Sequence, residues 1–172
     1  ITAGGATVYD GDRLETAPGG TLRARLGGPQ IYLRQSTTTQ VHGLPNGFSA
    51  ELGAGTVVVS SGQGETFQLL ANGVTIRPVG TQGTIAQVTR VNATEVLLTS
   101  TRGALRVTMG DEARTIESGS SYRMEVADEG PAPQGPVATG RRRRLLFYLI
   151  GGGVAAGTGI VVWRALMSPS GL

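Results

Sequence analysis

The chain of 172 residues contains no cysteine, no lysine, a single histidine and only 5% aromatic residues. Without cysteine it can form no disulfide, thiolate nucleophile, iron–sulfur cluster or Cys-ligated zinc site. A Ser-His-Asp triad or a His-ligated metal would depend on His42 alone, and no Gly-x-Ser-x-Gly elbow is present. The sequence therefore predicts no catalytic, cofactor-binding or metal-binding residue, and we expect a protein that is not an enzyme.

The basic residues are all arginines, 15 of them against 12 carboxylates, which gives a net charge of +3. Four of them stand in one run, formed by Arg141, Arg142, Arg143 and Arg144. Without that run the chain is close to neutral, so its pI of about 9.9 is a poor argument for nucleic-acid binding. We expect these arginines to bind anionic lipid headgroups, at about 1 kcal/mol each, and expect no nucleic-acid partner.

A long apolar run follows the arginines. Residues 145–163 contain no ionisable side chain. At about 1.5 Å per helical residue they would span roughly 28 Å, close to the thickness of the hydrocarbon core of a bilayer. Trp163 stands at the far end, where amphipathic rings prefer the headgroup level. We therefore predict a basic flank and a single-pass transmembrane helix over 141–166.

Small residues recur every fourth position inside this run. One series is formed by Gly151, Ala155 and Gly159, and the other by Gly153 and Gly157. On a membrane helix such a stripe allows a second helix to approach closely, which predicts packing against other membrane protein subunits. The alternative is that glycine is simply common here, at 28 of 172 residues, and that the stripe packs against lipid.

Before the anchor, the chain consists of short runs with a period of two and no helical period. In four runs an apolar residue is followed two positions later by another apolar residue, with a more polar residue between them. These runs begin at Leu22, Ile31, Leu105 and Tyr122. This period gives one buried and one solvated face. We predict an all-β fold, an antiparallel sandwich or a rolled β stack, followed by one C-terminal transmembrane α-helix.

Glycine-containing turns separate the runs, for example at 27–29, 45–47, 53–55 and 72–73. The triplets 57–59 and 96–98 are continuously apolar, which predicts strands that are covered on both faces or strands at the centre of a sandwich. Two carboxylates at Asp10 and Asp12 lack the ligand spacing of a calcium loop, so we expect an ordinary turn there.

Four parts result along the chain. We predict a β-rich domain over 1–129, a Pro/Gly linker over 130–140, the basic flank and membrane helix over 141–166, and a short tail over 167–172. The first residue is isoleucine, so a preceding segment was either removed or not included.

Several motifs resemble those of FecR-like domains. The most specific is 11–20 (GDRLETAPGG), and further similarity lies at 32–36, 52–57, 105–107 and 116–119. The resemblance implies a β-rich interaction domain. The transducer members of the family place a regulatory segment and a membrane helix before this domain, whereas here the predicted helix follows it. Sigma-factor regulation is therefore not carried over, and no functional residue is transferred.

Two functions remain open. The first is a non-catalytic, membrane-anchored accessory subunit that docks on a larger bacterial membrane complex, for example a bioenergetic one. The second is a FecR-like envelope sensor or regulator that binds a ligand or a partner protein. We expect the bacterial inner membrane as the location. The arginine run favours a cytoplasmic β domain by the positive-inside rule, and the family resemblance favours the periplasm.

Overall fold

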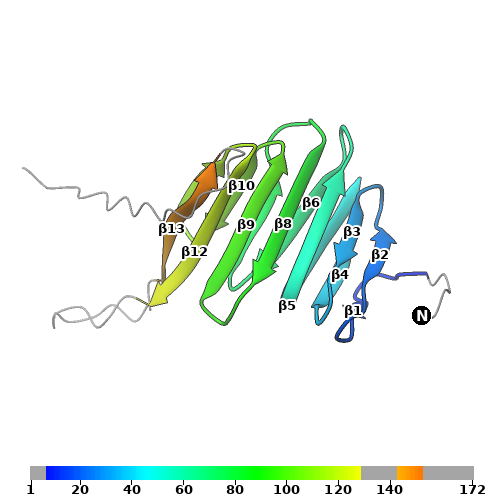
Figure 1. Cartoon of the computed structure of the whole chain (residues 1–172). Coiled ribbons are helices and arrows are strands. Elements are labelled where there is room, and N and C mark those ends of the chain that lie inside the picture. Colours follow the sequence, from blue (N-terminus) through cyan, green and yellow to red (C-terminus); the bar gives the residue numbers. More distant parts are fainter. Residues whose placement is uncertain (1–6, 129–142, 153–172) are drawn as a thin grey trace, which may run out of the picture.

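The computed structural model describes residues 7–128 and 143–152 of the chain. These residues form thirteen β-strands and no helix, which confirms the predicted all-β fold (Figure 1). Neighbouring strands pair antiparallel, with one parallel exception between β5 (Gly47–Ser61) and β6 (Thr66–Ala71).

The strands lie in two layers that share β5. Sheet A has the order β1 (Arg13–Glu15), β4 (Thr38–Leu44), the first half of β5, β6, β7 (Val74–Pro78), β10 (Leu105–Met109) and β11 (Glu112–Ile116). Sheet B has the order β2 (Leu22–Arg25), β3 (Gln30–Leu33), the second half of β5, β8 (Thr84–Arg90), β9 (Glu95–Arg102), β12 (Ser120–Asp128) and β13 (Arg143–Gly152). Successive hairpins alternate between the layers, so the sandwich grows in one direction along the chain (Figure 1).

Strand β5 crosses from one sheet to the other at residues 53–55, where the sequence predicts a hairpin turn. Before the crossing, Phe48 is buried with the alternate residues that follow it, and after it the buried set begins at Val57. The phase of alternation changes because the two sheets face each other across the core. Gly55 makes the bend with a φ of +84°, and a Cβ there would lie 2.4 Å from Thr37 Oγ1. The glycines therefore bend a strand instead of ending one.

Buried threonines satisfy the backbone at this crossing. Thr37 Oγ1 accepts a hydrogen bond from Thr56 N at 2.9 Å, and Thr37 N donates to Thr16 Oγ1 at 2.9 Å. Thr16 and Thr37 are both buried. An unpaired buried amide would cost about 1 to 3 kcal/mol, so these hydroxyls are a structural requirement of the bend.

The core lies between the sheets and follows the predicted alternation. Its largest fully buried side chains come from both layers: Phe48, Phe67, Ile31, Leu33, Leu52, Leu69, Ile76, Leu98, Leu105, Ile116, Met124 and Val57. Of the two alternatives for the apolar triplets, central strands of a sandwich are confirmed, since Val57, Val59, Val96 and Leu98 are fully buried, and cover on both faces is wrong, since Val58 and Leu97 point away from the core. Each sheet has one face on the core and one in solvent.

The structure differs from the predicted transmembrane helix over residues 143–152, which form strand β13 along the edge of β12. Strand β12 offers a row of backbone groups that β13 pairs from Asp128 to Ser120. Leucine, phenylalanine, tyrosine and isoleucine suit a strand as well as a membrane helix, and pairing decides between them. Within the ranges 7–128 and 143–152 no helix is long and apolar enough to cross a bilayer. The rest of the predicted span, 153–166, lies outside the described residues.

Candidate interaction surface

The predicted membrane and packing residues fall into two groups. Arg143 and Arg144 begin β13, exposed and opposite Asp128 and Ala127, and Gly151 stands near its other end. The remaining predicted residues lie outside the described residues: Arg141, Arg142, Gly153, Ala155, Gly157, Gly159 and Trp163. Lipid binding by the arginine run and helix packing by the small-residue stripe therefore stay predictions.

Strand β13 is held to the sandwich by its inward side chains. Leu145 is buried, and the ring of Phe147 meets that of Tyr122 edge-on, with centroids 6.3 Å apart and planes at 86°. The guanidinium carbon of Arg114, on β11 of the opposite sheet, lies 4.9 Å from the Phe147 centroid. Leu145 N also donates to Oε2 of Glu112 at 3.3 Å. These contacts close the end of the sandwich between β11 and β13.

Strand β13 exposes apolar side chains on both of its faces, because Leu146 lies opposite Glu125 on the outer face and Leu149 lies opposite Tyr122 on the side of Leu145 and Phe147. Leu146, Leu149 and Ile150 have relative exposures of 41%, 46% and 51%, and they are three of the seven large apolar residues exposed in the described part of the chain. A register shift at Ser121/Tyr122 leaves Ile150 without a directly opposite residue on β12. We call these three residues the β13 apolar row. An exposed apolar cluster on an edge strand is a typical protein or membrane contact.

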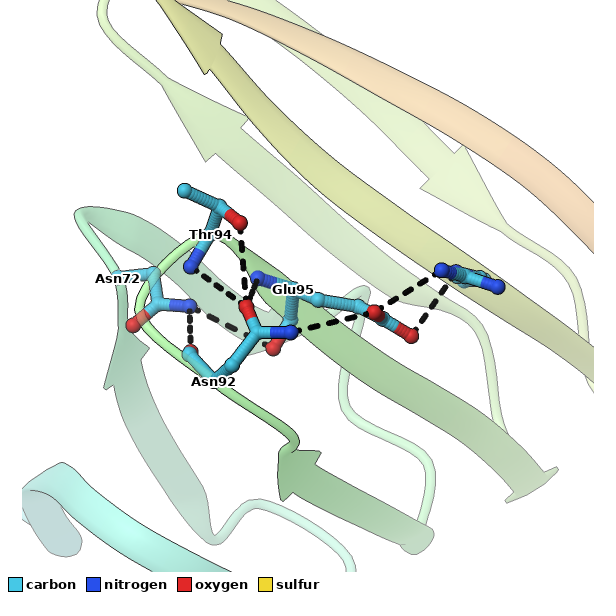
Figure 2. A network of polar contacts seen from close by, with 5 residues as sticks. Asn72, Asn92, Thr94 and Glu95 are labelled. Atoms are coloured by element: carbon cyan, nitrogen blue, oxygen red, sulfur yellow. Dashed lines mark hydrogen bonds and ion pairs between the residues drawn. The ribbon is translucent and has the colours of Figure 1, made fainter.

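A polar network next to this edge joins the two sheets (Figure 2). Asn72, in the β6–β7 turn of sheet A, donates through Nδ2 to the carbonyl oxygen of Asn92 at 2.9 Å. Asn92 Oδ1 in turn accepts from the backbone amides of Thr94 and Glu95, both at 2.9 Å. Glu95 holds Arg123 through two contacts, Nε to Oε1 at 2.8 Å and NH2 to Oε2 at 2.9 Å. The network fixes the loop before β9, although within the described residues the buried Oδ1 of Asn72 accepts no hydrogen bond.

The acidic turn at the other end of the molecule is structural, in line with the sequence analysis. Asp12 Oδ2 accepts from Tyr9 N at 2.7 Å, and Asp10 Oδ1 accepts from Gly43 N at 2.8 Å. His42 Nδ1 lies 3.6 Å from Asp10 Oδ1 at the lip of a hollow of about 210 Å³. Over the ranges that the structure covers, no three His, Asp or Glu side chains form a group that could hold a metal ion.

Solved structures with a similar fold exist, although the sequence similarity is low. No family model matches the chain, and no curated protein is similar to it. Two crystal structures of a putative anti-sigma factor from Parabacteroides distasonis ATCC 8503 are similar in architecture, each with a TM-score of 0.58 and 10% sequence identity. The match covers 80% of this chain and 59% of the other, so the chain spans about three fifths of the length of that protein. At this identity the likeness shows a shared fold alone.

The motif at 11–20 that resembles FecR-like domains has a role within this fold. Gly11 has a φ of +84° and donates its amide to the Val41 carbonyl at 2.8 Å. Asp12 caps the adjoining turn, and Thr16 completes the buried threonine pair at the β5 crossing. These residues support the path of the chain, so the motif describes a scaffold and leaves its binding surface undefined.

Proposed function

We propose that this chain is a non-catalytic accessory subunit of a bacterial membrane assembly, and that it docks on a partner subunit through the β13 apolar row. The observation that carries the proposal is the exposure of Leu146, Leu149 and Ile150 together on one edge strand. Docking would remove this apolar area from water, at about 25 cal/mol per Å². The arginines that begin the strand, Arg143 and Arg144, would face an acidic rim of the partner or anionic lipid.

The proposed association with a membrane is based on the apolar run 145–163. Part of this run forms strand β13, and this limits how the run could cross a bilayer. If residues 145–152 remain in the sheet, 153–163 is too short for a spanning helix, since it gives only about 16 Å against a hydrocarbon core of about 30 Å. A single-pass helix over 145–163 therefore requires that β13 leave the sheet. While β13 stays paired with β12, residues 145–152 would contact a membrane protein or the bilayer interface through their exposed side chains.

Photo-crosslinking in the native membrane tests the docking surface. A photoreactive phenylalanine analogue at Leu149 is expected to give one dominant crosslinked product, which contains a membrane protein. The matched control is the same analogue at Leu44, which is 38% exposed on β4, at the other end of the sandwich from β13. Equal crosslinking of the same protein from both positions, or none from Leu149, would contradict the proposal.

The fold likeness to an anti-sigma factor supports a second candidate, an envelope sensor or regulator. A sensor has to report across the membrane, so removal of the tail from residue 168 onward is expected to abolish its response. An accessory subunit should still assemble after the same deletion. Native electrophoresis of the assembly, compared between the full chain and the deletion variant, separates the two candidates.

A further inference from the structure

The outer face of sheet B carries a shallow hollow at the edge opposite β13. Its volume is about 380 Å³, and its lining comes from three neighbouring strands: Arg23, Gln30, Tyr32, Arg34, Val58 and Ser60. The register places Tyr32 directly between Arg23 on β2 and Val58 on β5. Arg34 follows two residues later on the same face of the sheet, about 7 Å along the strand. Two arginines therefore lie beside one aromatic ring.

Among residues 7–128 and 143–152, the guanidinium groups of this hollow have no acidic partner. Within the described residues, no carboxylate lies within 4.0 Å of Arg23 or Arg34, and Arg34 NH2 contacts only the neutral Oε1 of Gln87, at 3.3 Å. Elsewhere on the same sheet Arg123 is held by Glu95. Arg123 is thus neutralised by a carboxylate, whereas among the described residues Arg23 and Arg34 have none and face solvent.

The floor of the hollow is partly apolar. Tyr32 and Val58 are half-buried on adjacent strands and face outward, while Arg23, Arg34 and Ser60 are exposed around them. Guanidinium groups bind carboxylates and phosphates with directed hydrogen bonds, and an aromatic ring beside them adds apolar contact. A ligand that matches both has an anionic group attached to an apolar or aromatic part.

We propose that this hollow binds an organic anion whose carboxylate contacts Arg23 and Arg34 and whose apolar part lies against Tyr32 and Val58. The carboxylate belongs to a small metabolite or to an acidic side chain of a partner polypeptide, which offer the same chemistry. The proposal is independent of the one for β13, because the two surfaces lie at opposite edges of sheet B.

Ligand-observed saturation-transfer NMR on the full chain in nonionic detergent tests the proposal, with empty micelles as the blank. The probes are hippurate, which joins a carboxylate to an aromatic ring, its neutral amide, and the capped dipeptide acetyl-Phe-Glu-amide. We expect hippurate or the dipeptide to bind at least tenfold more tightly than the neutral amide. The tighter of the two identifies the source, metabolite-like or peptide-like.

Charge reversal locates the site. Arg23→Glu and Arg34→Glu are each expected to weaken binding of the preferred probe about tenfold or more. Arg106→Glu is the matched control, because Arg106 is an exposed arginine on β10 of the other sheet. Circular dichroism confirms that each variant folds.

Three results would overturn the proposal: no binding of either acid, equal binding of the neutral amide, or equal losses in Arg23→Glu and Arg106→Glu. The last result would show that the anion responds to the overall charge of the protein and does not bind in this hollow.

Discussion

The two edge strands of sheet B, β2 and β13, expose side chains of opposite chemistry. On β2, Arg23 and Arg25 point into solvent and the inward residues are small or half-buried. On β13, the exposed side chains that follow Arg143 and Arg144 are those of the apolar row, Leu146, Leu149 and Ile150. Each strand pairs with one neighbour among the described residues, so the difference lies in the side chains and not in the hydrogen bonding.

Charge on an edge strand opposes pairing with another chain, because a guanidinium group would have to leave water. The β2 edge is protected in this way, and the β13 edge is protected much less along its middle. This difference supports the two proposals, that one edge binds an organic anion and that the other contacts an apolar surface of a partner.

The largest effect is expected for a disulfide between β12 and β13. Glu125 and Leu146 lie directly opposite each other in the register, and such pairs have Cβ atoms about 5 Å apart. In the variant Glu125→Cys/Leu146→Cys we therefore expect nearly complete disulfide formation on mild oxidation, since the chain has no other cysteine. Gel mobility with a maleimide–polymer label measures the yield.

The control pair is Glu125→Cys/Leu149→Cys, in which the second residue lies three positions away, at about 10 Å along the strand. It should remain mostly reduced. The same measurement in native membranes sharpens the contrast between the edges. Low yield there, with high yield in detergent, would mean that the apolar run leaves the sheet to form the membrane helix, and low yield in both would contradict β13.

A smaller effect is expected from truncating one aromatic residue near each edge. Phe147→Ala removes the edge-on contact with Tyr122 and the Arg114 contact, so it should lower the free energy of unfolding by about 1 to 3 kcal/mol. Tyr32→Ala should lower it by about 1 kcal/mol or less, because no ring contact of Tyr32 exists in the described structure. Urea unfolding in the same detergent measures both.

Arg114→Ala provides a check on the cause. If the cation–π contact contributes to stability, Arg114→Ala should lower the free energy of unfolding by about 0.5 to 1 kcal/mol in the native chain. In the Phe147→Ala variant the same substitution should lower it by almost nothing. If Phe147→Ala and Tyr32→Ala lower the free energy of unfolding by the same amount, the side chains of β13 hold their strand no more strongly than those of the β2 edge.

The alternating pattern predicts the faces of most strands correctly. Ile31 and Leu33 are buried, and Tyr32 and Arg34 between them face outward, because every strand has one face on the core. The pattern fails for residues 145–150, where both faces are apolar. A run without alternation has no period, so the sequence could not separate an edge strand with an exposed apolar face from the start of a membrane helix.

Long-range pairing explains what else the sequence could not predict. The turn at 27–29 predicts that Arg23 and Tyr32 become neighbours across a hairpin, yet Val58 joins them from a strand that lies 26 residues further along the chain. Likewise, a positive φ at Gly55 is compatible with a hairpin turn or with a bend. Only the pairing of β5 with both sheets decides that it is a bend.

The smallest effect is expected for one ion pair near each edge. Near β13, Arg123 contacts Glu95 through two nitrogens, and the Glu95 side chain is only 14% exposed. At the other end, Arg13 and Glu15 lie 3.6 Å apart with side chains 68% and 64% exposed. Double-mutant cycles on unfolding should therefore give a coupling energy of about 1 kcal/mol for the first pair and about 0.2 kcal/mol for the second. Raising the salt concentration should reduce the second coupling to nothing and leave most of the first, since a partly buried, two-point contact is screened less than an exposed one. Couplings of equal size would mean that the polar network beside β13 adds no more to stability than an ordinary surface pair.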